Sequence, residues 1–160
     1  RIGLNKFIVS PAETIFFVTT SFSYSKAEHF KSRKRIEHLF ANGKSIQSNA
    51  LRMYYFLECG TPVSFSLRGG KALLQCGVGA SKKNFSRAVD RNRIKRLLRE
   101  VYRKQKSSLM DSLSPRAVHA ELFFIYTGKK LPEYSQLEEQ ISGLLVRLQK
   151  IVHEKFSETT

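Results

Sequence analysis

Charged side chains are most concentrated in residues 82–106, KKNFSRAVDRNRIKRLLREVYRKQK. They hold 11 basic and 2 acidic residues, a net charge of +9. At helical spacing, one side carries a ladder formed by Arg91, Lys95, Arg99 and Arg103. Like charges four residues apart destabilise an isolated helix by roughly 0.2–0.5 kcal/mol per pair. Such a face calls for an external anion, and arginine favours bidentate contact with phosphate, so we predict that it binds nucleic acid.

A second candidate site is aromatic. In an alternating, strand-like run, Arg52, Tyr54 and Phe56 point to one face. Ile36 and Phe40 of a preceding helical stretch could lie against them, which would give a stacking platform for single-stranded nucleotides. Phe40 and Phe56 fit an ordinary core equally well. Tyr54 beside Arg52 is therefore the stronger functional candidate.

Catalytic and metal-binding patterns are weak. The four histidines and two cysteines have neither CxxC nor HExxH spacing, and there is no GxSxG sequence. Gly77-Val78-Gly79 lacks the third glycine of a dinucleotide loop, and we expect these glycines to let a strand end pack closely under a helix. A protein-only nuclease is least favoured, because the adjacent Glu138 and Glu139 cannot face one another. We predict no catalytic residue and no metal ligand.

The composition indicates one folded domain. The chain has 160 residues with a net charge of +15, and 41% of them are hydrophobic. Residues 31–52 carry a net +5, which with the +9 of residues 82–106 leaves about +1 elsewhere. Nucleic acid is the default partner of such a chain, with an acidic protein or a membrane surface as alternatives. The absence of an 18-residue apolar run excludes a membrane-spanning helix, and the low cysteine content favours the cytoplasm.

Hydrophobic periodicity predicts the elements that position these residues. Helices are expected over residues 29–41, 88–104 and 133–154, and strands over 44–47, 51–58, 72–80 and 121–127. A loop or small hairpin is expected between the second and third strands. The predicted fold class is α+β, a single-domain α-β-β-β-α-β-α sandwich with a central mixed sheet.

The run from Ser81 to Glu100, centred on Arg91-Asn92-Arg93, closely resembles the signature of the bacterial ribonuclease P protein subunit. The stretch from Ile36 to Ser45 is similar to that family's first helix and turn. The resemblance implies an RNA-binding domain at 26–156 with an unusual left-handed βαβ crossover. Residues 1–25 lie outside it, and we expect them to form a flexible N-terminal extension.

The resemblance also implies a function. Members of the family assist a catalytic RNA that removes the 5′ leader from precursor tRNA, using Mg²⁺ held by the RNA, while the protein supplies no catalytic group and binds no cofactor. The residues implied to contact the catalytic RNA are Lys82, Lys83, Arg87, Arg91, Asn92, Arg93, Lys95, Arg96 and Arg99. The implied leader-binding cleft consists of Ile36, Phe40, Arg52 and Tyr54. Many members carry an aromatic residue where Ile36 stands. The implied partners are the catalytic RNA and precursor tRNA, with no membrane. We expect the chain to be a monomer or to bind the RNA 1:1.

Two non-enzyme alternatives stay open at this point. A ribosomal protein that binds rRNA structurally would explain the charge, but gives no reason for a cleft at Tyr54 and Phe40. A DNA-binding regulator is less favoured, because a strand, and not a second helix with a short turn, precedes the basic helix.

Overall fold

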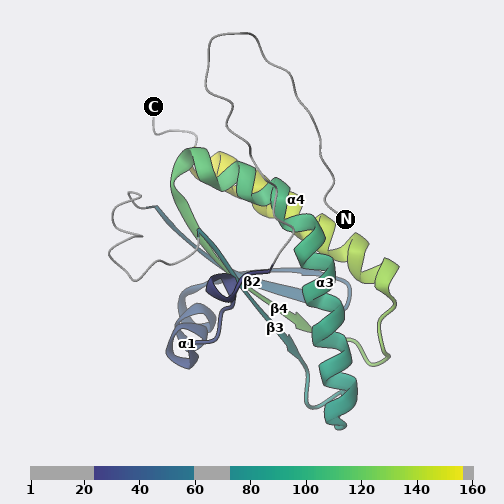
Figure 1. Ribbon diagram of the computed structural model, residues 1–160. Helices are drawn as coiled ribbons and strands as arrows, with labels where there is room; N and C mark the ends of the chain where they lie inside the picture. Colours follow the sequence, from purple (N-terminus) through teal and green to yellow (C-terminus); the bar gives the residue numbers. More distant parts are fainter. Residues whose placement is uncertain (1–23, 60–72, 157–160) are drawn as a thin grey trace.

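The computed structural model describes residues 24–59 and 73–156, and this part of the chain forms an α+β fold (Figure 1). Its strands are β1 (Lys44–Ser48), β2 (Leu51–Cys59), β3 (Leu74–Ala80) and β4 (Val118–Tyr126). Its helices are α1 (Arg33–Asn42), α3 (Ala88–Leu113) and α4 (Tyr134–Phe156), with short 3-10 turns η1 (Lys26–Glu28) and η2 (Ser114–Arg116). The predicted fold class is confirmed. The predicted loop after β2 and most of the predicted N-terminal extension lie outside the described residues.

The sheet is mixed, with the strand order β1-β2-β4-β3. β1 and β2 form an antiparallel hairpin whose turn contains Asn49 at a φ of 48°, a left-handed conformation that asparagine tolerates. β2 pairs antiparallel with β4, and β3 pairs parallel with β4. Since α3 connects the two parallel strands, the predicted βαβ crossover is present, and its left hand stays a prediction.

The two faces of the sheet are covered differently. On one face α3 contacts β3 and β4, while α4 contacts β1 and β2 (Figure 1). Leu51, Met53 and Tyr55 are buried in this core with Ile94 and Leu98 of α3, as the alternation and the helical spacing predict. The other face carries only α1 among the described helices. This second face is thus covered by fewer helices than the first.

Two elements extend three or more residues beyond their predicted bounds. α3 continues to Leu113 and not to residue 104, because its buried stripe runs on through Leu109 and Leu113 after the positive charges thin out. The helix ends where Ser114 and Pro115 begin η2. β4 starts at Val118 and not at residue 121, because its first residues, Val118 and His119, already pair with Cys59 and Glu58 of β2. Burial sets the end of α3 and strand pairing sets the start of β4. Neither can be inferred from the spacing of charged residues.

The chain before α1 lies along the free edge of β3, so the first helix starts at Arg33 and not at residue 29. The Phe30 amide donates to the Cys76 carbonyl at 3.0 Å. A buried ion pair joins Glu28 to Lys106 of α3 at 2.6 Å. Tyr24 also packs here, edge-on to a buried ring of α3. The packed chain therefore begins before the predicted boundary at residue 26.

Candidate nucleic-acid interface

The N-terminal half of α3 presents most of the predicted RNA-binding side chains to solvent. The exposed members on the helix or at its start are Arg87, Asn92, Arg93, Arg96 and Arg99. Arg91 and Lys95 are partly buried, while Lys82 and Lys83 are exposed on the turn that precedes the helix. The structure thus brings these nine residues onto one helix and the turn leading into it.

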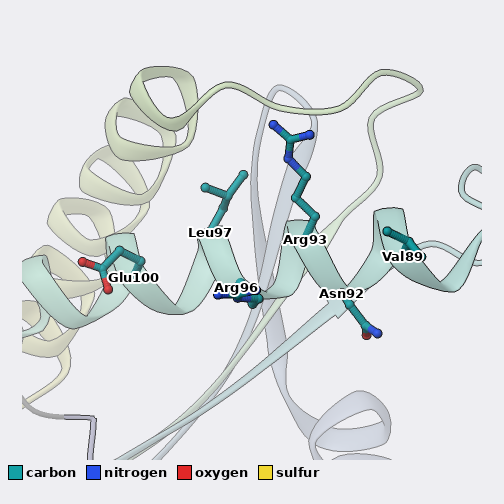
Figure 2. A pocket seen from close by; sticks show the side chains of 6 residues that line it. All are labelled: Val89, Asn92, Arg93, Arg96, Leu97 and Glu100. Atoms are coloured by element: carbon teal, nitrogen blue, oxygen red, sulfur yellow. The ribbon is translucent and has the colours of Figure 1, made fainter.

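A shallow groove of about 740 Å³ runs along this surface (Figure 2). It is lined by Val89, Asn92, Arg93, Arg96, Leu97 and Glu100. Val89 is 69% exposed, so it adds aliphatic surface to the groove. Guanidinium groups beside apolar carbon can bind phosphates while the aliphatic side chains cover sugar carbons. The groove therefore suits a sugar–phosphate backbone better than a small charged ligand.

The basic surface ends at Glu100. Arg103, the last member of the predicted ladder, pairs with this carboxylate at 2.7 Å, and Lys104 lies 4.0 Å from it. The hydrogen bond from Arg103 holds the pKa of Glu100 below its usual range, so the carboxylate stays charged. The part of the ladder that has no acidic partner on α3 therefore ends one turn earlier than predicted, at Arg99.

Arg91 has a second task that the sequence does not reveal. Its Nη1 atom donates to the carbonyl of Phe85 at 2.8 Å and also to that of Ser86. These bonds fix the turn that carries Lys82 and Lys83 against the start of α3. Arg91 therefore organises the basic surface as well as adding charge to it.

The predicted aromatic residues meet on the open face of the sheet. The ring of Phe40 lies edge-on to Tyr54, with centroids 4.8 Å apart, and edge-on to Phe123 at 5.3 Å. Phe40 is 41% exposed, so it is not an ordinary core residue. Arg52 lies next to Tyr54 with its Nη1 atom 3.5 Å from the hydroxyl. Phe56 packs instead against His38, at 5.3 Å.

Phe123 is a further member of this aromatic cluster, and the sequence did not indicate it. Its ring lies over β3 at Gly77 and Gly79, where an added Cβ would lie 2.5 Å and 3.1 Å from the ring. The two glycines therefore make room for a ring of the neighbouring strand and not for a helix, which corrects the prediction. Alternation along β4 could have placed Phe123 on one face, but only the register aligns it with Gly77 and Tyr54.

A buried polar cluster fastens α1 to the sheet at the end of the cleft. Arg35 forms an ion pair with Glu121 of β4 and donates to Oε1 of Gln75 at 2.6 Å. Glu121 is only 5% exposed. Ile36 and Phe40 are one helical turn apart, so they share a side of α1. The cluster thus fixes how far both side chains stand from the strands.

Among the residues that the structure describes, no group of three or more His, Cys, Asp or Glu side chains could hold a metal ion. None of the helices in these described residues combines the length and the hydropathy that a membrane span requires. Cys59 and Cys76 are free thiols.

Comparisons with known proteins agree with this geometry. The family model described as Ribonuclease P matches residues 24–149. The chain is 35% identical over 128 residues to the ribonuclease P protein component of Porphyromonas gingivalis strain W83, covering 80% of this chain and 88% of that protein. It is 31% identical over 138 residues to the corresponding protein of Chlorobium phaeobacteroides, covering 81% and 91%.

Solved structures show the same fold. The Staphylococcus aureus RNase P protein superposes with a TM-score of 0.56 at 20% identity, covering 79% of this chain and 99% of that one. The Thermotoga maritima RNase P protein gives a TM-score of 0.53 at 21% identity, covering 73% and 98%. The rRNA-binding alternative is not favoured. With a family model matching more than three quarters of its length, the chain belongs to the ribonuclease P protein family, the RNA-binding protein component of a tRNA-processing ribonucleoprotein.

Proposed function

We propose that this chain assists the removal of the 5′ leader from precursor tRNA by holding two RNAs at once. The observation that carries the proposal is the separation of its two surfaces. The basic helix α3 covers one face of the sheet, and α1 lies on the other (Figure 1), where its Phe40 meets Tyr54 and Phe123. A folded RNA on α3 and a single strand in the cleft would therefore not compete for the same side chains.

The surface of α3 suits the folded catalytic RNA. Exposed side chains such as Arg93, Arg96 and Arg99 would neutralise phosphates and release their counterions. Their guanidinium groups make bidentate contacts with phosphate, which position an RNA without reading its sequence. Asn92, exposed on the same helix, adds a neutral donor.

The cleft suits the single-stranded leader. Phe40, Tyr54 and Phe123 present ring surface beside Arg52. Base–aromatic stacking contributes about 1–3 kcal/mol per base and tolerates any base, so leaders of different sequence can be held. Ile36 would extend the cleft through apolar contact.

In this proposal the RNA and its Mg²⁺ ions carry out the hydrolysis. The protein contributes no catalytic group. One copy of the chain per RNA, in the cytoplasm, would bring leader and scissile phosphate into register with the RNA active site. Its positive charge would also reduce repulsion between the two RNAs, so that metal ions bind at lower concentration.

Reconstitution tests the proposal. The full chain is added to a bacterial ribonuclease P RNA and precursor tRNA at low magnesium, and 5′ cleavage is measured. We expect stimulation that is larger for a substrate with a long leader than for one with a single leader nucleotide. No stimulation with either substrate would overturn the function, and equal stimulation would overturn the role of the cleft.

A further inference from the structure

The turn after β4 lies against the turn before α3, although some 45 residues separate them in the sequence. The side-chain amide of Asn84 donates to the carbonyls of Thr127 at 2.7 Å and Gly128 at 3.2 Å. Next to it, the Ser81 amide donates to the carbonyl of Tyr126 at 3.1 Å. The two turns therefore form one unit at the start of α3.

The conformation of residues 127–130 is held by the protein itself. The hydroxyl of Tyr126 donates to the carbonyl of Lys130 at 3.0 Å, so the ring crosses back over the turn. A Cβ at Gly128 would lie 2.3 Å from that hydroxyl, which explains the glycine. The Thr127 amide donates to the carbonyl of Ala50 at 2.8 Å. Because these bonds exist in the free protein, binding of a partner would cost little conformational entropy of the turn.

This unit concentrates positive charge, and half of it, on Lys129 and Lys130, lies outside the family signature. Lys129 and Lys130 are exposed on one turn, as are Lys82 and Lys83 on the other. In Figure 2 the side chain of Arg93 rises from α3 on the side of the connection that leads into α4. Two acidic residues lie close in sequence to this unit, Asp90 in the first turn of α3 and Glu133 just before α4. They are fewer than the four lysines.

We propose that Lys129 and Lys130 form, with Lys82 and Lys83, a second phosphate-binding surface for the same catalytic RNA. The inference rests on the proposed function and extends its RNA-binding surface to a segment far away in the sequence. Two features favour RNA backbone as the occupant. The surface adjoins the start of α3, where Arg93 rises on the side of the connection into α4 (Figure 2). Lysines also act as point charges that position a backbone without reading bases.

The salt dependence of RNA binding tests this surface. The double variant Lys129→Ala/Lys130→Ala is titrated with the catalytic RNA over a range of KCl concentrations. Each lost phosphate contact lowers the slope of log K against log salt by about 0.7–0.9, so we expect a slope shallower by about 1.4–1.8 and weaker binding at low salt. The matched control is Lys150→Ala/Lys155→Ala, which removes equal charge from exposed positions on α4, roughly 25–30 Å away along the helix.

A slope equal to that of the control would overturn the inference. A loss seen only with precursor tRNA alone, and not with the catalytic RNA, would also overturn it, because the lysines would then contact substrate. Arg96→Ala separates this failure from failure of the proposed function. If Arg96→Ala weakens binding while the double variant does not, the function stands and the second surface falls. If the unaltered chain does not bind the catalytic RNA, both fall.

Discussion

The basic surface of α3 and the aromatic cleft under α1 are built in opposite ways. The first comes from a single stretch, residues 81–100, with side chains that reach solvent and need little from the rest of the fold. The cleft takes Phe40 from α1, Tyr54 from β2 and Phe123 from β4, over glycines of β3. Charge density is thus a local property, whereas a stacking platform requires strands in register.

The two surfaces should also fail differently. Exposed cations act through long-range charge, so removing one weakens binding gradually and salt screens the effect. The cleft depends on packing and on the ion pair between Arg35 and Glu121, so a single change beneath it can alter both stability and leader binding. Five substitutions, apart from their controls, test this difference.

The largest effect is expected for Glu121→Gln, which removes the buried partner of Arg35. We expect the free energy of unfolding to fall by about 3 kcal/mol, the low end for a broken buried ion pair because a quarter of Arg35 is exposed. Denaturant titration measures this loss. Arg33→Ala, which breaks the exposed pair with Glu37, is the control and should cost less than about 0.5 kcal/mol. Equal losses in the two variants would contradict the anchoring of α1.

Phe40→Ala should affect leader binding and leave the basic surface intact. Loss of one stacked base costs about 2 kcal/mol, so affinity of the assembled enzyme for precursor tRNA should fall about 30-fold. Affinity for mature tRNA and for the catalytic RNA should not change. Val146→Ala, at a comparably exposed apolar position on α4, is the control. A similar loss with mature tRNA would show that the effect is not specific to the leader.

Arg96→Ala should do the reverse. We expect binding of the catalytic RNA to weaken about tenfold, which corresponds to about 1.4 kcal/mol for one charge-assisted contact, with leader discrimination preserved. The assembled enzyme should also need more magnesium, because the variant has less positive charge to reduce the repulsion between the two RNAs. Arg91→Ala should share this effect and additionally loosen the turn at Phe85. Cleavage measured against magnesium concentration checks both, and an unchanged dependence would refute the charge mechanism.

Ile36→Phe should have the smallest effect, and in the opposite direction. An aromatic ring one turn before Phe40 would lengthen the stacking surface. We expect leader affinity to rise about fivefold, or about 1 kcal/mol. Competition between precursors with long and short leaders measures it. No gain would place Ile36 outside the part of the cleft that contacts bases.

Local patterns in the sequence predicted much of the fold and of the basic surface. The alternation around Met53 and Tyr54 and the stripe of α3 are confirmed, because each arises from neighbours within one element. The packing of residues 24–30 along the edge of β3 and the full length of α3 were not predicted. Both depend on burial against distant segments, of which the pairing of Glu28 with Lys106 is an example.

The sequence by itself determined that this chain carries a helix with more positive charge than it can neutralise, and hence an anionic partner. Helical spacing and charge are properties of consecutive residues, so no other information was needed. Only the tertiary structure decided that Phe123 completes the cleft, that Arg103 is neutralised, and that two lysine-bearing turns meet at Asn84. Such contacts join residues far apart in the chain, and strand register and packing bring them together.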